Sequence, residues 1–115
     1  MAWTELTSVN QLEDIKNESQ IAPVLIFKHS TTCSISAMAL NRMQRNSKHD
    51  IPDLKIYYLD LRAHRDVSNT IASMFNVEHE SPQVLLIDKG QAVYDRSHGD
   101  IDAGAIREFL DSVTS

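Results

Sequence analysis

The chain has 115 residues, of which 42% are apolar and 23% charged, a composition typical of a globular domain and too apolar for disorder. Its 11 basic and 16 acidic residues give a net charge of −5 without a basic cluster, which argues against a nucleic-acid partner. No apolar run is long enough to cross a membrane, and a lone cysteine excludes an internal disulfide and fits a reducing compartment. We therefore expect one domain over residues 1–115, in the cytoplasm, without a membrane partner.

The first half of the chain predicts two helices, each followed by a strand. Residues 8–20 have helical apolar spacing, and residues 24–27 form a continuous apolar run of the kind found in buried strands. Residues 33–47 are helical in period again, and residues 54–61, rich in Ile and Tyr, predict a second strand. The stripe of this second helix that we expect to face the core consists of Ile35, Met38, Ala39 and Met43.

The second half predicts a helix, a hairpin and a final helix. Apolar residues with helical spacing occur over 67–75, and residues 84–87 form a third strand. The turn at 89–91 predicts a hairpin into a fourth strand over 92–97. Asp102 is the expected N-cap of the last helix. The residues of that helix expected to face the core are Ile106, Phe109, Leu110 and Val113.

This order of elements predicts an α/β fold. Two strand–helix–strand units indicate parallel neighbours, and the closing hairpin adds an antiparallel pair, so we expect a central four-stranded mixed sheet flanked by four helices. Sheets of this kind leave the carboxyl ends of their strands open for chemistry. The first predicted strand ends at about Ser30, and Cys33 follows at once.

Cys33 lies in the turn T-T-C-S-I-S, which opens a helix. The unpaired backbone N–H groups and the macrodipole at such a position stabilise a thiolate relative to a thiol. Thr31 and Thr32 keep the approach small and polar, and the hydroxyls of Ser34 and Ser36 are possible donors to the sulfur. The alternative is a buried free cysteine that packs as a small apolar residue, but Cys33 lies off the apolar stripe.

The order of elements, the cysteine after the first strand and the segment S-P-Q-V resemble the thioredoxin superfamily over essentially the whole chain. The resemblance implies a thioredoxin-like fold over residues 1–115. It also implies that Pro82 is cis and faces the active-site cysteine, and that the backbone of Ser81 pairs with a substrate chain. Gly90 matches the glycine of the hairpin turn in that superfamily.

The segment F-K-H-S-T-T-C-x-I-S resembles, more specifically, the monothiol bacilliredoxins, small cytoplasmic proteins with the signature T-C-P-I-S. The chain departs from that signature at Ser34, which stands in the place of the proline. The resemblance implies a disulfide oxidoreductase that removes bacillithiol from S-bacillithiolated proteins. It implies no permanently bound cofactor, with bacillithiol, a low-molecular-weight thiol, as the co-substrate.

The residues themselves are consistent with exchange through one thiol. A Cys33 thiolate can attack a mixed disulfide and take the small thiol onto itself. Because Ser36 stands where dithiol proteins carry a second cysteine, another thiol must resolve the adduct. Phe27 stands where dithiol thioredoxins carry a buried aspartate, which fits the same interpretation. Basic candidates for contacting an anionic small thiol are Lys28, His29 and Arg65.

Two other functions stay open at this level. One is an iron–sulfur carrier similar to the monothiol glutaredoxins, although their C-G-F-S turn has a glycine after the cysteine where this chain has Ser34. The other is a redox-silent binding module with a thioredoxin fold, for which Ser36 is the motivating feature. The five histidines lack the spacing of a zinc site, so we expect no metal.

Overall fold

Five strands form one sheet in the computed structural model, which describes residues 3–114. The strands are β1 (Thr4–Glu5), β2 (Val24–His29), β3 (Lys55–Asp60), β4 (Gln83–Asp88) and β5 (Gln91–Ser97). The helices are α1 (Asn10–Glu18), α2 (Ser34–Asp50), α3 (Arg65–Met74) and α4 (Ala103–Thr114), with the short 3-10 helix η1 (His98–Asp100) before α4. Over the described residues, none of these helices is long and apolar enough to cross a membrane.

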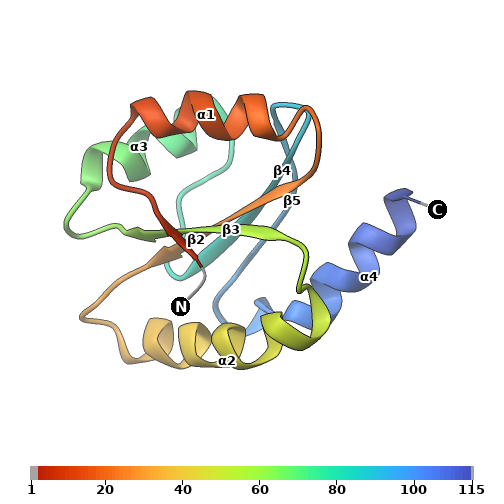
Figure 1. Cartoon of the computed structure of the whole chain (residues 1–115). Helices are drawn as coiled ribbons and strands as arrows, with labels where there is room; N and C mark the ends of the chain where they lie inside the picture. Colours follow the sequence, from red (N-terminus) through yellow and green to blue (C-terminus); the bar gives the residue numbers. More distant parts are fainter. Residues whose placement is uncertain (1–2, 115) are drawn as a thin grey trace.

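The sheet has the order β1-β3-β2-β4-β5, with β4 antiparallel to both of its neighbours and the other pairs parallel (Figure 1). Lys28 of β2 pairs with Gln83 of β4, which pairs in turn with Ser97 of β5. His29 of β2 pairs with Asp60 of β3. The ends of β2, β3 and β5 therefore lie beside the start of β4, at the same end of the strands. The segments at this end, residues 30–33, 61–64, 78–82 and 98–100, are called the thiol edge.

Helices cover both faces of the sheet, with α1 and α3 on one side and α2 and α4 on the other (Figure 1). Successive residues of a strand point to opposite faces, so each strand contributes to two separate cores. The core under α1 and α3 contains Leu12, Ile15, Ile26, Val67, Ile71 and Leu85. The core under α2 and α4 contains Leu25, Phe27, Ala39, Met43, Leu86 and Ile106. This alternation continues beyond the apolar residues and sends Lys28 and His29 to opposite faces.

The predicted mixed sheet flanked by four helices is confirmed, but the count of four strands is wrong. The additional strand, β1, has two exposed residues that pair with Tyr57 and Tyr58 of β3. Two exposed residues carry no alternation of apolar and polar side chains, so the sequence pattern cannot reveal such a strand.

The predicted apolar stripe of α2 is also partly wrong. Ile35 and Met38 are 55% and 66% exposed, while the polar side chains of Ser36 and Ser47 are buried. The inward face of the helix thus includes hydroxyls that an assignment by hydrophobicity places outside. At the other end of the chain Val113 is exposed, because the end of α4 runs beyond the sheet (Figure 1).

Candidate active site

Cys33 is the N-cap residue of α2, in an extended conformation with φ −105° and ψ 121°. Its N–H donates to the carbonyl of Ser30 (3.2 Å), and its carbonyl accepts the first helical hydrogen bond, from Ala37 (3.0 Å). The side chain is half-buried, and no hydrogen bond from residues 3–114 reaches the sulfur. Cys33 therefore lies at the helix start, outside both cores, where free N–H groups of the first turn can stabilise a thiolate.

Ser36 connects the first turn of α2 to the end of β2. Its buried hydroxyl oxygen accepts the N–H of Ser30 (3.0 Å) and lies 2.7 Å from Nδ1 of His29. The hydroxyl is thus hydrogen-bonded at the end of β2, and the donation from Ser36 to the Cys33 sulfur that the sequence left possible is not found. Burial lowers the pKa of His29, although the Asp60 carboxylate and the contact with Ser36 act in the opposite direction. Burial therefore disfavours the charged form of this imidazole.

Arg62, in the loop after β3, contacts the turn that carries Cys33. Its Nη1 donates to the hydroxyl oxygen of Thr32 at 2.9 Å, and its backbone N–H donates to the carboxylate of Asp60 at 3.1 Å. Arg65, the residue predicted from the sequence, is exposed at the start of α3 and makes no hydrogen bond with this turn. The signal that points to Arg62 is its position just after the end of β3, because β3 lies next to β2 in the sheet. The remaining predicted turn residues, Thr31 and Ser34, are exposed.

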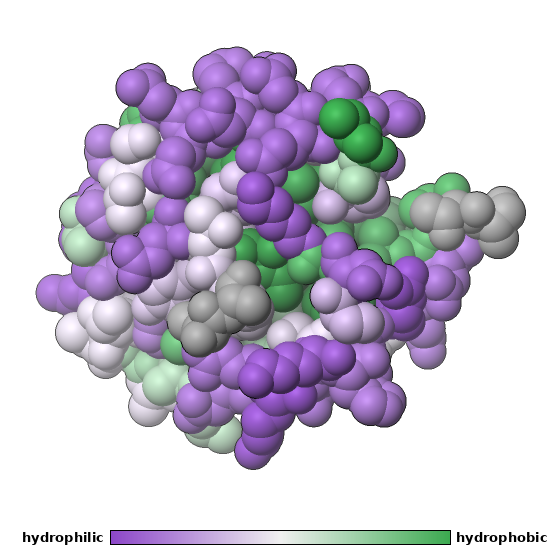
Figure 2. Space-filling model, viewed as in Figure 1, coloured by the Kyte–Doolittle hydropathy of each residue, from purple (hydrophilic) through white to green (hydrophobic). Residues whose placement is uncertain are grey.

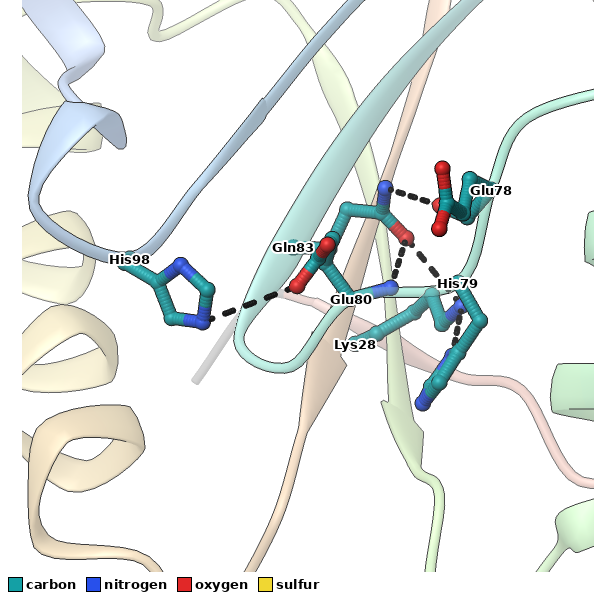
Figure 3. Close-up of polar contacts among 6 residues, drawn as sticks. All are labelled: Lys28, Glu78, His79, Glu80, Gln83 and His98. Atoms are coloured by element: carbon teal, nitrogen blue, oxygen red, sulfur yellow. Dashed lines mark hydrogen bonds and ion pairs between the residues drawn. The ribbon is translucent and has the colours of Figure 1, made fainter.

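Lys28 lies inside the protein on the α3 side of the sheet and is only 1% exposed. Figure 3 shows its side chain beside those of His79 and Gln83. Its Nζ is 2.6 Å from Nδ1 of His79 and donates to Oε1 of Gln83 at 3.1 Å. The Gln83 amide also accepts the N–H of Glu80 (3.3 Å) and donates to the carbonyl of Glu78 (3.0 Å). This set of residues, the Lys28 cluster, fixes the loop that precedes β4, because Gln83 is hydrogen-bonded to two of its backbone groups.

Lys28 and His29 were predicted to contact an anionic small thiol, and the structure places both inside the protein. Their side chains lie on opposite faces of the sheet, and each is hydrogen-bonded to the protein itself. They stand behind the thiol edge, where they can hold its loops in position, rather than at its surface. Burial lowers the pKa of Lys28 to about 8, despite the opposing influence of Glu80.

Ser81 and Pro82 lie at the thiol edge just before β4, and the peptide bond between them is cis, as the resemblance implied. The carbonyl of Pro82 accepts the N–H of His98 (3.1 Å), and the His98 ring lies 3.8 Å from the Glu80 carboxylate (Figure 3). Within residues 3–114 the backbone N–H and C=O of Ser81 make no hydrogen bond, so both are free to pair with an extended chain. The Ser81 hydroxyl oxygen is buried and unpartnered.

The molecule also has an apolar hollow away from the thiol edge. Figure 2 shows apolar surface in the middle of one face, and a cavity of about 390 Å³ is lined there by Trp3, Ile51, Pro52, Leu54 and Ile56, with Lys48 and Lys55 among its polar residues. Except for Trp3, which precedes β1, these residues belong to the C-terminal end of α2, the segment after it and the start of β3, whereas Cys33 lies just before α2. The cavity therefore takes no part in the chemistry of the thiol.

We expect the buried charge of Lys28 to make folding stability depend on pH. The folded protein loses this proton near pH 8 and the unfolded chain near pH 10.5, so the unfolded state binds more protons between these values. Stability should therefore rise with pH over this window, by about 3 kcal/mol for the whole shift. Urea unfolding at pH 7, 8, 9 and 10 measures the rise.

The Lys28→Met variant should lose this rise with pH, whereas Lys48→Met, at an exposed position of α2, should retain it. Equal pH profiles for wild type and Lys28→Met would show that the buried ammonium is not destabilised in the folded state.

Comparisons with known proteins agree with this architecture. Residues 4–106 match the family model described as "Monothiol bacilliredoxin BrxC". A solved protein proposed to be an oxidoreductase with a thioredoxin fold is 36% identical, with a TM-score of 0.82 over 93% of this chain and 92% of that chain. The thioredoxin of Trypanosoma brucei brucei is 16% identical with a TM-score of 0.74, over 97% of this chain and 90% of that one.

The thioredoxin of Fasciola hepatica is 17% identical with a TM-score of 0.71, over 95% of this chain and 97% of that one. At such low identity the two thioredoxins show the fold alone. The family match and the 36% identical structure together support a thiol redox role.

Proposed function

The chain belongs to the monothiol bacilliredoxin family, and on that premise we propose that it removes bacillithiol from S-bacillithiolated proteins by thiol–disulfide exchange at Cys33. The substrate is a protein whose cysteine carries the small thiol as a mixed disulfide. The products of the first step are the free protein thiol and a mixed disulfide between Cys33 and bacillithiol.

The first step conserves the number of disulfide bonds. The Cys33 thiolate attacks the sulfur of the small thiol, so a new S–S bond forms while the bond to the substrate protein breaks. The substrate cysteine leaves as a thiolate and takes its proton from solvent. In the second step a free small thiol, as its thiolate, attacks the adduct, releases Cys33 and leaves as a symmetrical disulfide.

The observation that carries this proposal is the position of Ser36. In a dithiol protein the residue three positions after the nucleophile supplies the resolving sulfur. Here it supplies a buried hydroxyl, hydrogen-bonded to the Ser30 N–H and close to His29 Nδ1, and the chain contains no other cysteine. An adduct on Cys33 cannot be resolved within this chain, which supports exchange with small thiols over general disulfide reduction.

The surroundings of Cys33 support each part of the step. Cys33 directly precedes the first turn of α2, where helical N–H groups lack partners within the helix, and the residue is half-buried, so a mixed disulfide can reach it. The free backbone groups of Ser81 can pair with the chain of a modified protein.

The dependence on free small thiol tests the proposal. With substrate in tenfold excess and no free thiol, we expect release of bacillithiol from the substrate to stop after about one equivalent per protein molecule. Addition of free bacillithiol should restore continuous turnover. Complete turnover in the absence of any free thiol would contradict the single-thiol route.

The same assay separates the alternatives. Substrates modified with glutathione or coenzyme A show whether bacillithiol is the preferred small thiol. A redox-silent binding module would release nothing in either phase. An iron–sulfur carrier would develop the visible absorption of a [2Fe–2S] cluster after anaerobic reconstitution.

A further inference from the structure

We infer that Arg62 is a specificity-determining residue that recognises a carboxylate of the small thiol while that thiol is bound at Cys33. This inference rests on the proposed function and names the charge of the ligand that the site selects. The loop after β3 thereby takes part in recognising the small thiol, a role that neither the sequence motif nor the position of Cys33 indicates.

The first argument is the place of the guanidinium. Arg62 is exposed, and its Nη1 donates to the hydroxyl oxygen of Thr32, the residue directly before Cys33. The backbone of this loop is fixed, because the Asp60 carboxylate accepts the N–H groups of both Arg62 and Ala63 (3.1 and 3.3 Å). A small thiol joined to the Cys33 sulfur is therefore attached next to the residue that the guanidinium contacts.

The second argument is that the guanidinium has unused donors. An arginine carries five N–H donors, and Arg62 uses one of them, at Nη1, for Thr32. Within residues 3–114 no carboxylate forms an ion pair with the Arg62 guanidinium, and the contact with Thr32 is its only hydrogen bond. The remaining donors can bind a carboxylate, which a planar guanidinium does through two parallel hydrogen bonds.

The third argument is that the three basic residues predicted from the sequence to contact a small thiol are buried or make no hydrogen bond with the turn that carries Cys33. Lys28 is buried, with its ammonium in contact with His79 and Gln83. His29 is buried beside Ser36, and burial lowers its pKa. Arg65 makes no hydrogen bond with the turn that carries Cys33. Compared with these three residues, Arg62 alone is both exposed and hydrogen-bonded to this turn.

Two symmetrical disulfides of similar size, one anionic and one neutral, test this role. We would measure the rate at which Cys33 forms a mixed disulfide with bis(2-carboxyethyl) disulfide and with bis(2-hydroxyethyl) disulfide, at low salt. The readout is the ratio of the anionic rate to the neutral rate. Arg62→Gln should lower this ratio about fivefold, the size of one solvent-exposed charge interaction. Arg62→Lys should lower it less, because the charge remains without the planar fork.

Arg65→Gln is the matched control, since it removes the same charge three residues away and should leave the ratio near that of wild type. An equal decrease in Arg62→Gln and Arg65→Gln would overturn the inference, because it would reflect net charge alone. An unchanged ratio in Arg62→Gln, with normal reaction of Cys33, would overturn it while leaving the proposed function intact. Failure of the wild type to react with either disulfide would overturn both.

Discussion

Replacing Cys33 with serine is expected to reduce release of the small thiol from modified proteins to the rate measured without protein. A serine hydroxyl is not ionised near neutral pH and does not form the mixed disulfide through which exchange proceeds. The loss should be chemical rather than structural, because Cys33 is half-buried and no side chain hydrogen-bonds to its sulfur within residues 3–114. The measurement is the initial rate of release from an S-bacillithiolated protein, with free bacillithiol present.

Urea unfolding serves as the control for this variant, and we expect its free energy of unfolding to differ from that of wild type by less than about 0.5 kcal/mol. A stable Cys33→Ser protein that still released the small thiol at the wild-type rate would contradict a catalytic role for the only thiol in the chain.

Replacing Gln83 with leucine is expected to destabilise the protein by about 3 kcal/mol or more. Gln83 is 2% exposed, and its amide pairs with Lys28 and with the backbone of Glu78 and Glu80. Leucine fills similar space but leaves the ammonium of Lys28 with one hydrogen-bond partner. The Glu80 N–H and the Glu78 carbonyl also lose their partner. The loop that carries Ser81 loses the same contacts, so exchange should slow as well. Urea unfolding at pH 7 measures the stability change.

Gln91→Leu provides the matched control, because the same substitution at an exposed position of β5 should change stability by less than about 0.5 kcal/mol. A double variant separates the buried charge from the lost hydrogen bonds. Adding Lys28→Met to Gln83→Leu removes the poorly paired ammonium and should restore part of the stability. A Gln83→Leu protein as stable as Gln91→Leu would contradict the assigned role of the Lys28 cluster.

The order and faces of most elements could be predicted because each carries a clear apolar period. The first four residues of β2 form a continuous apolar run, and the helix α3 buries Val67 and Ile71 as its spacing indicates. The start of the last helix could be predicted from the type of residue at Asp102. Its carboxylate accepts the N–H of Ala105 (3.0 Å), as expected of an N-cap. Both signals depend only on residues close together in the sequence, so they can be recognised without knowledge of the fold.

The contacts behind the thiol edge could not be predicted, because they join residues far apart in the chain. Lys28 and Gln83 occupy strand positions where a buried apolar residue is the usual expectation, and each is satisfied by the other. The buried side of α2 was misassigned for the same reason, since the partners of Ser36 are His29, at the end of β2, and Ser30 directly after it. Arg62 was missed in favour of Arg65 because the distance between a loop and a neighbouring turn depends on strand order.

The mass of the intact protein during a single turnover tests the central claim most directly. Wild-type protein is mixed with one equivalent of an S-bacillithiolated protein in the absence of free thiol, and both masses are followed over time. We predict that the substrate loses one bacillithiol while this protein gains the same mass, and that the added mass maps to the peptide containing Cys33. Loss of bacillithiol from the substrate without any adduct on Cys33 would contradict the account.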